Sequence, residues 1–135
     1  MKGVFEDRPT LGFAVSDWVS NAATAEETHG AISGWDTSRV DDMSELFKDK
    51  TTFNAQLDWD TSKVTTMSNT FRNAEAFNSE LAWDTSSVTR MDGTFDTAEA
   101  FNSELVWDTS SVTRMDATVA HAEAFNSELN WDTSK

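Results

Sequence analysis

The amino-acid sequence predicts an α/β solenoid of 24-residue repeats, each a short parallel strand followed by a short helical segment, behind an N-terminal helical cap. Three observations support this fold class. One tetrapeptide recurs at a constant spacing, apolar residues recur with it in fixed columns, and residues 1–31 lack the pattern. A chain of 135 residues is long enough for one repeat array and its cap.

The repeat is defined by the tetrapeptide Trp-Asp-Thr-Ser, which returns every 24 residues. We therefore predict a cap at 1–31 and a repeat region at 32–135, with units that begin at Trp35, Trp59, Trp83 and Trp107 and a partial unit from Trp131. One unit is too small to bury its own large apolar side chains, so the units should stack into a continuous core. The columns expected to form this ladder are Trp35, Trp59, Trp83 and Trp107; Met43, Met67, Met91 and Met115; and Phe53, Phe77, Phe101 and Phe125.

Two periodicities follow one another within each unit. The Leu-x-Trp alternation at 105–107 is typical of a short strand, and the Asp-Thr-Ser that comes next suits a helix N-cap or a tight turn. The following apolar residues are spaced by 3, 4 and 3 residues, which favours an amphipathic helix: Val88, Met91, Phe95 and Ala98. Gly93 and neighbouring β-branched Thr residues disfavour that helix, so an irregular or 3₁₀ segment is the alternative.

The first 31 residues are expected to cover the open core of the first repeat. Thr10 is expected to cap a helix that ends near Asn21. A second helical turn is expected at 25–29, ended by Gly30. The apolar face of the first helix is predicted to be Leu11, Ala14, Val15, Trp18 and Val19.

The motif Phe-Asn-x-x-Leu-x-Trp-Asp-Thr-Ser-x-Val-Thr-x-Met-x-x-x-Phe-x-x-Ala, clearest from Phe77 to Ala98, recurs through about residues 31–135. It resembles the BspA-like, leucine-rich-repeat-type surface protein repeats of mycoplasma lipoproteins, other bacterial surface proteins and marine algal reading frames. The resemblance implies a leucine-rich-repeat-like solenoid with a surface-display or adhesion-type role, on the cell surface or secreted, and carries over no catalytic residue. One departure affects the strand register: three positions separate Ile32 from Trp35, but two separate Leu81 from Trp83.

The net charge of −14 disfavours nucleic acid and anionic membrane surfaces as partners, because both carry negative charge. Basic proteins and divalent cations stay open as partners. No apolar stretch approaches the length of a membrane span, and no secretory signal is recognised at the N-terminus. The absence of cysteine excludes a Cys-ligated zinc site.

A column of aspartates follows the predicted strands, with Asp60, Asp84 and Asp108 as its central members. Stacked strands lie about 4.8 Å apart, so these carboxylates must be capped or bridged to avoid repulsion. Capping of the turn by hydrogen bonds with backbone N–H groups is the favoured interpretation. A calcium ion held by Asp, Thr and Ser oxygens is the alternative.

A second acidic column flanks the same strand, and with an aspartate of the first unit it forms a predicted acidic ribbon: Glu80, Glu104, Glu128 and Asp58. A solvated surface that resists aggregation is one interpretation. A docking site for a basic protein partner is the other.

No residues are arranged for catalysis. His29 and His121 occupy unrelated positions, and the repeated Ser residues have no base at a fixed spacing. We therefore predict a non-catalytic module, without a cofactor, that presents a surface for protein interaction or cell-surface display. The alternatives are a structural spacer in a longer repeat array and, less favoured, a calcium-stabilised adhesion module. A weak homodimer through the uncapped C-terminal end, around 128–131, is also expected.

Overall fold

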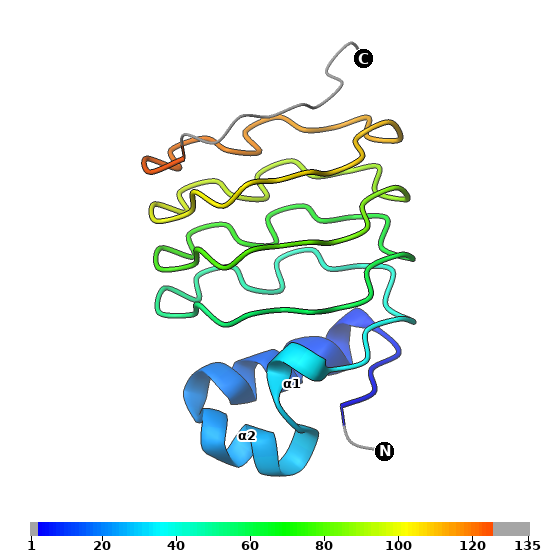
Figure 1. The fold of residues 1–135 in the computed structure, drawn as a ribbon, viewed down its shortest axis with the longest axis vertical. Helices are drawn as coiled ribbons and strands as arrows, with labels where there is room; N and C mark the ends of the chain where they lie inside the picture. The colour runs from blue at the N-terminus through cyan, green and yellow to red at the C-terminus, as the bar shows by residue number, and fades with distance from the viewer. Residues whose placement is uncertain (1–2, 126–135) are drawn as a thin grey trace.

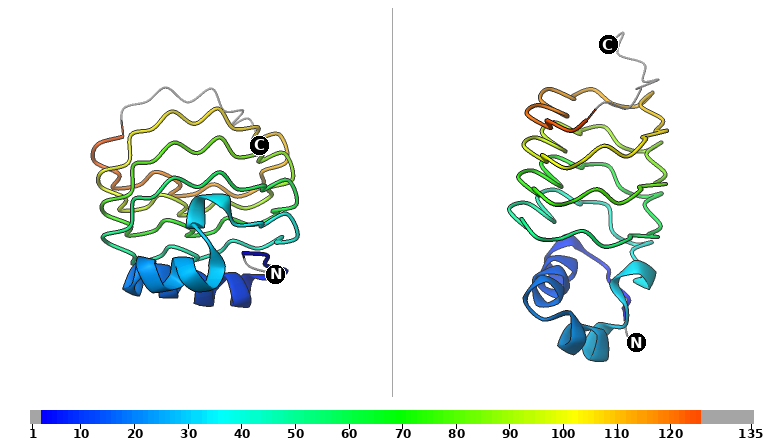
Figure 2. Two further views of the ribbon diagram at one scale, coloured as in Figure 1. Left: turned by 60° about the horizontal axis from the view of Figure 1, so that its bottom comes forward. Right: turned by 60° about the vertical axis from the view of Figure 1, so that its left-hand side comes forward.

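The computed structural model describes residues 3–125. Two helices, α1 (Arg8–Ser20) and α2 (Ala22–His29), and the short 3₁₀ helix η1 (Ile32–Gly34) lie at one end of the molecule (Figure 1). Above them the chain winds in stacked coils, and each coil passes along one side of the stack and returns along the other (Figure 2). We name these the extended side, represented by residues 79–84, and the turn side, represented by residues 88–98, with their equivalents 24 residues before and after.

The predicted α/β leucine-rich-repeat-like solenoid, with a parallel strand and a short helix in each repeat, is wrong. Within residues 3–125 the helices are confined to the N-terminal end, and no sheet forms. Parallel pairing in this part of the chain is limited to isolated bridges: Val4 with Asp36, Asp42 with Thr66, Thr66 with Arg90, and Arg90 with Arg114.

The extended side has the alternation of a strand without its backbone pairing. Leu81 and Trp83 point into the core, while Glu80 and Ala82 are exposed. Yet within residues 3–125 no backbone N–H of residues 79–84 donates to a backbone carbonyl. Residues 79–84 are instead joined to neighbouring coils by side chains, whereas at the N-terminal end of the stack the Asp58 N–H donates to the Ser33 carbonyl at 3.2 Å.

Two kinds of buried side chain, Trp and Thr, make such joints, and the exposed Gln56 amide adds another by donating to the Glu80 carbonyl at 3.1 Å. The indole Nε1 of Trp83 donates to the Leu57 carbonyl of the coil below at 3.1 Å. The buried Thr61 hydroxyl donates to the Asp84 carbonyl of the coil above at 3.0 Å. The Thr61 hydroxyl therefore lies inside the stack and is not exposed at its surface.

The turn side is a run of tight turns where the spacing predicted a helix. Each turn closes with an N–H that donates three residues back, as from Thr94 to Met91 at 3.2 Å. Gly93 and Thr97 have φ values of 66° and 59°. The same two positions are left-handed in the other coils: Glu45 and Asp49, Asn69 and Asn73, Ala117 and His121. A left-handed residue at every fourth position is incompatible with a right-handed α-helix.

These turns carry the backbone bonds between coils. Alternate N–H groups point to the next coil, so that Met91 donates to the Arg114 carbonyl at 2.9 Å and Phe95 to the Thr118 carbonyl at 2.7 Å. Parallel bonding between coils therefore exists, but on the side where the sequence predicted a helix.

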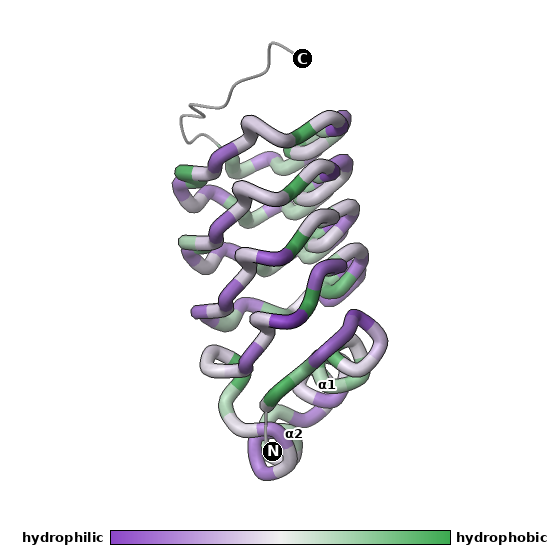
Figure 3. Tube along the Cα trace, turned by 90° about the vertical axis from the view of Figure 1, so that its right-hand side faces the viewer, coloured by the Kyte–Doolittle hydropathy of each residue, from purple (hydrophilic) through white to green (hydrophobic). Residues whose placement is uncertain are grey.

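The core is a set of apolar columns that run through the stack. Hydrophilic and hydrophobic positions recur at the same place in successive coils (Figure 3). Phe77, Met91 and Phe95 have no exposed surface. The rings of Phe71 and Phe95 stack with centroids 5.5 Å apart and planes within 1°. Burying one such side chain contributes about 1.5–3 kcal/mol, so the columns supply much of the stability.

The N-terminal helices cover the first coil. Helix α1 begins at Arg8 because the Asp7 side chain accepts a hydrogen bond from the Thr10 N–H at 3.0 Å, so the predicted cap at Thr10 is wrong. Asn21 ends α1 and caps α2, accepting from the Thr24 N–H at 3.2 Å. The face of α1 that packs on the core is buried Leu11, Ala14 and Val15 with partly buried Trp18 and Val19.

Helix η1 accommodates the extra residue between Ile32 and Trp35, relative to the spacing of Leu81 and Trp83. This extra turn lies between Ile32 and Trp35. As a result the Trp59 indole donates to the Ile32 carbonyl at 2.7 Å, as the Trp83 indole donates to Leu57. The aliphatic column thus stays in place despite the extra residue.

Candidate functional site

The aspartate column caps the corner between the two sides of each coil. The Asp84 Oδ1 accepts hydrogen bonds from the Ser86 hydroxyl at 2.6 Å and the Ser86 N–H at 3.0 Å. The Val88 N–H donates to the Thr85 carbonyl at 3.0 Å and closes the turn. The same aspartate–serine hydroxyl contact recurs at Asp36 and Asp60, and the same N–H contact recurs there and at Asp108.

These hydrogen bonds lower the pKa of the corner carboxyls. The Ser86 hydroxyl and then the Ser86 N–H hold the pKa of Asp84 below its ordinary value, while the neighbouring charges of Asp60 and Asp108 raise it. Serine lowers the pKa of Asp36 and Asp60 in the same order. Within residues 3–125 no group of three or more His, Asp or Glu side chains is placed to hold a metal ion.

The extended side presents an acidic face. Glu80 and Glu104 form one exposed column, and four exposed aspartates lie beside it. Glu128 of the predicted ribbon lies outside the described residues. We define the acidic face by its carboxylates Asp58, Asp60, Glu80, Asp84, Glu104 and Asp108.

The middle of this face changes from coil to coil. Between the glutamate and aspartate columns the exposed residue is Asp58, then Ala82, then Val106, whose side chain is 82% exposed. In an extended chain, residues four apart on one face are separated by about 13 Å, and neighbouring coils by about 4.8 Å. The face therefore offers two columns of negative charge on either side of a variable, partly apolar column.

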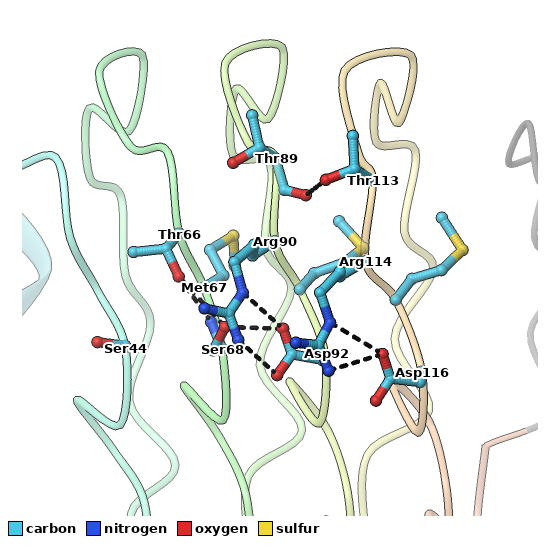
Figure 4. A network of polar contacts seen from close by, with 12 residues as sticks. Ser44, Thr66, Met67, Ser68, Thr89, Arg90, Asp92, Thr113, Arg114 and Asp116 are labelled. Carbon is cyan, nitrogen blue, oxygen red and sulfur yellow. Dashed lines mark hydrogen bonds and ion pairs between the residues drawn. The ribbon is translucent and has the colours of Figure 1, made fainter. Parts of the chain in front are cut away.

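The turn side carries a polar network that the sequence interpretation missed (Figure 4). The Arg90 guanidinium donates to both oxygens of Asp92 at 3.2 and 3.3 Å, and the Ser68 hydroxyl of the coil below donates to Asp92 at 2.9 Å. Arg114 and Asp116 repeat the pair one coil further on, at 3.4 Å. The available signal was the Arg-x-Asp sequence, which recurs with the 24-residue spacing.

The charges of this network compensate one another. Burial raises the pKa of Asp92, but the hydrogen bonds from Ser68 and Arg90 outweigh burial and hold the pKa below its ordinary value. Asp92, Asp96 and Asp116 of the turn side thus each have an arginine partner, whereas the carboxylates of the acidic face are exposed to solvent.

The two histidines lie in separate places and contact different aspartates. His121 is exposed and lies 3.2 Å from an oxygen of Asp96. His29 lies 3.5 Å from Asp17 and packs against Phe5 and Trp35. A shallow hollow on the outer side of α1 is lined by Arg8, Pro9, Gly12, Phe13 and Ser16, which do not form an acid–base pair.

The model of a protein family, described as Mycoplasma protein of unknown function, DUF285, matches residues 13–130. The chain belongs to this family. The match spans most of α1 and the repeat region, and it fits the expected family at the level of a repeat-type family of unknown function. Comparison with curated proteins and with solved structures gave no significant match.

Both named α-helices are short, with 13 and 8 residues. Among residues 3–125 none of the helices is both long enough and apolar enough to cross a membrane.

Proposed function

We propose that the protein is a non-catalytic repeat module that presents its acidic face to a basic protein partner, in a surface-display role like that of the BspA-like proteins it resembles. The observation that supports this proposal is the contrast between the two sides. Asp92 on the turn side is paired with Arg90. Within residues 3–125, Glu80 and Asp84 on the extended side form no ion pair with Lys, Arg or His.

Stacking brings the like charges of the acidic face close together, and the effect of Asp60 and Asp108 on the pKa of Asp84 reflects their mutual repulsion. A cationic surface placed over this face relieves that repulsion. Attraction of this kind raises the association rate and weakens with salt. The variable column at Asp58, Ala82 and Val106 would give the contact its apolar part.

A structural spacer in a longer array is the second candidate, because the internal columns stack without needing a partner. A calcium-stabilised adhesion module is less favoured, since one oxygen of each corner carboxylate, such as those of Asp60 and Asp84, already accepts hydrogen bonds from serine.

The test compares two double variants that remove the same charge. Glu80→Gln with Glu104→Gln changes the acidic face, and Glu75→Gln with Glu99→Gln changes two other exposed positions with the same spacing. The probe is a synthetic decalysine peptide, titrated by calorimetry at low and physiological salt. We expect the first pair to weaken binding several-fold and the second pair to change it little.

Equal losses in the two double variants would show attraction by net charge alone and would favour the spacer. Absence of decalysine binding by the unmodified chain at low salt would also overturn the proposal. The corner aspartates are left intact, because their substitution would disturb the turns they cap.

A further inference from the structure

Successive coils are bonded to one another at the asparagine corner, which we define as residues 75–78 and their equivalents, between the turn side and the extended side. The Ala76 N–H donates to the Thr51 carbonyl of the coil below at 3.2 Å. The Asn78 N–H donates to the Asn54 side-chain oxygen at 2.8 Å. The next coil repeats both bonds, at 3.1 and 2.7 Å: Ala100 to Glu75, and Asn102 to Asn78.

In the first coil the same two donors lack an acceptor. Thr52 and Asn54 hold the equivalent positions, so their N–H groups point toward the N-terminal end of the stack. Within residues 3–125 neither of these N–H groups donates to a protein oxygen. The acceptors would belong to the residues 25 and 24 positions earlier, Glu27 and Gly30. Glu27 lies inside α2, and Gly30, which ends that helix, has no side chain.

The two donors lie at a hollow between α1 and the first coil. The hollow has a volume of about 220 Å³ and is lined by six residues: Trp18, Val19, Thr52, Phe53, Asn54 and Ala55. Trp18 and Val19 are partly buried against the core, and Phe53 is only 5% exposed. Helix α1 therefore covers the Phe53 ring, but it leaves Thr52 and Asn54 exposed beside that ring.

We propose that this hollow binds a peptide segment of a partner protein that presents two oxygen acceptors, a backbone carbonyl and, three residues further along, the side-chain oxygen of an asparagine. The stack shows that this pair matches the donors, because residues 51–54 and 75–78 present it to the coil above. Donors two residues apart in an extended chain are separated by about 7 Å, so one carboxylate or phosphate group is too small to accept from both. The site is separate from the acidic face and does not depend on its function.

The side chain between the two acceptors must be small. In the repeats this position is a Phe that stacks on the next Phe, as Phe53 and Phe77 do with ring centroids 6.0 Å apart. At the hollow, Trp18 and Val19 already pack where such a ring would lie. An alanine at this position of the segment leaves that packing intact.

The hollow also lacks one donor that the coils above possess. The Ser79 hydroxyl donates to the Asn54 side-chain oxygen at 2.9 Å, and the Ser103 hydroxyl donates to that of Asn78 at 3.3 Å. The equivalent residue of the first coil is Ala55, which has no hydroxyl. The asparagine of a bound segment therefore receives one hydrogen bond fewer than Asn54 receives within the stack, and a serine at position 55 should supply it.

A second copy of this chain is a less suitable occupant. The side-chain oxygens of Asn54 and Asn78 already accept hydrogen bonds within their own stack, and two copies with a net charge of −14 repel each other. The homodimer predicted from the sequence through residues 128–131 involves residues outside the described part of the chain. Self-association through the hollow is an outcome of the test.

The experiment follows the NMR spectrum of the full chain during titration with the synthetic peptide acetyl-Thr-Ala-Ala-Asn-Ala-Lys-amide. We expect the amide signals of Thr52 and Asn54 and the indole N–H signal of Trp18 to shift and saturate. Hydrogen exchange of the two amides should slow, because N–H groups are protected when they enter hydrogen bonds. The amides of Ala76 and Asn78 should keep their exchange rates. A control peptide with Leu in place of Asn keeps the side-chain size, loses the acceptor and should bind at least about threefold more weakly.

A matched pair of variants tests the mode of binding. Ala55→Ser adds the hydroxyl that Ser79 uses in the coil above, and it should tighten binding of the Asn peptide about three- to tenfold, the effect of one hydrogen bond. Its affinity for the Leu peptide should not change. Ala82→Ser adds the same hydroxyl at an exposed position of the extended side and should leave both affinities unchanged.

Four results would overturn the proposal. Two concern the peptides: unshifted amide signals of Thr52 and Asn54 at the highest soluble peptide concentration, or equal affinities for the Asn and Leu peptides. A third is equal affinity of Ala55→Ser and the unmodified chain for the Asn peptide. The last is slow exchange of the two amides in the free chain that is lost on dilution, together with a dimer in sedimentation, which would show that a second copy fills the hollow.

Discussion

The two sides of the stack are joined in opposite ways, although both repeat with the same 24-residue step. On the extended side, at residues 79–84, the joints are side chains, such as the Trp83 indole and the Thr61 hydroxyl that donates to the Asp84 carbonyl. On the turn side they are backbone N–H groups, such as that of Phe95. The contrast shows that an alternating sequence predicts an extended, half-buried chain, but not that the chain pairs as a strand.

Sequence variation does not distinguish the two sides. On the extended side one outward position changes from Asp58 to Ala82 to Val106. On the turn side the first left-handed position of each coil also changes, from Glu45 to Asn69, Gly93 and Ala117. The difference that bears on function is therefore in the pairing of charges, such as that of Asp92 with Arg90 on the turn side.

The largest expected effect on stability concerns the apolar core that lies between the two sides of the stack. Phe95 is fully buried and contacts Phe71, Phe101 and Trp107. Phe95→Ala should lower the free energy of unfolding by about 3–5 kcal/mol, measured by urea denaturation. Phe13→Ala, at a position 76% exposed, is the control and should change it by less than about 0.5 kcal/mol. Similar effects in the two variants would contradict the position of the core.

A smaller effect tests the side-chain joints of the extended side. Thr61→Val keeps the shape but removes the hydroxyl that donates to the Asp84 carbonyl. Because Thr61 is 2% exposed, water cannot replace the bond, and the cost should be about 1–2 kcal/mol. The exposed Thr89, whose hydroxyl donates to the Thr65 carbonyl at 3.1 Å, is the matched site. If Thr89→Val is as costly as Thr61→Val in urea denaturation, the buried hydroxyl is not a special joint.

The next prediction distinguishes a tight turn from a helix by whether one substitution raises or lowers the stability of the protein. Ala117 has a φ of 57°, so Ala117→Gly should stabilise the protein by about 1 kcal/mol. In a helix the same change would destabilise it by about 1 kcal/mol. Ala124→Gly is the control, because Ala124 is outside the set of left-handed residues, and it should be slightly destabilising. Thermal and urea unfolding of both variants give the answer.

The smallest effect concerns the corners that join the two sides. The pKa values of Asp60 and Asp84 are lowered from 3.8 by their serine hydrogen bonds. These carboxyls therefore stabilise the folded state fully above that pH, and the contribution is lost as the pH falls through the lowered pKa. Removing the hydroxyls in Ser62→Ala with Ser86→Ala should reduce this stabilisation.

The measurement is the difference in urea midpoint between the unmodified chain and the double variant from pH 7 to pH 2.5. We compare the two proteins at each pH because protonation of the other carboxyls also reduces the net charge of −14 as the pH falls, and this changes the stability of both proteins. The difference should be constant above about pH 5 and shrink below about pH 4. Ser87→Ala, an exposed neighbour of the corner, is the control. A difference that grows as the pH falls would contradict the corner hydrogen bonds.

The sequence alone determined the period, the buried columns and the outward positions of Glu80 and Glu104. Burial of apolar surface dominates the free energy of folding and depends on side-chain type. The positions of the apolar residues in the sequence therefore predict which positions are buried. The recurring Arg-x-Asp was also in the sequence, although only the structure showed that Arg90, Asp92 and Ser68 meet across two coils.

The tertiary structure decided how the backbone bonds are used. Every residue except proline has the same N–H and C=O groups, so a sequence does not state which neighbour they will pair with. That choice depends on the coil above, as when Thr97 donates to the Ala120 carbonyl at 2.8 Å. The left-handed conformations of Thr97, Ala117 and His121 are likewise ones these residues do not favour alone, and the stack imposes them. The spacing of Val88, Met91 and Phe95 thus fixed a buried face, and packing of one coil on the next made that face from turns instead of a helix.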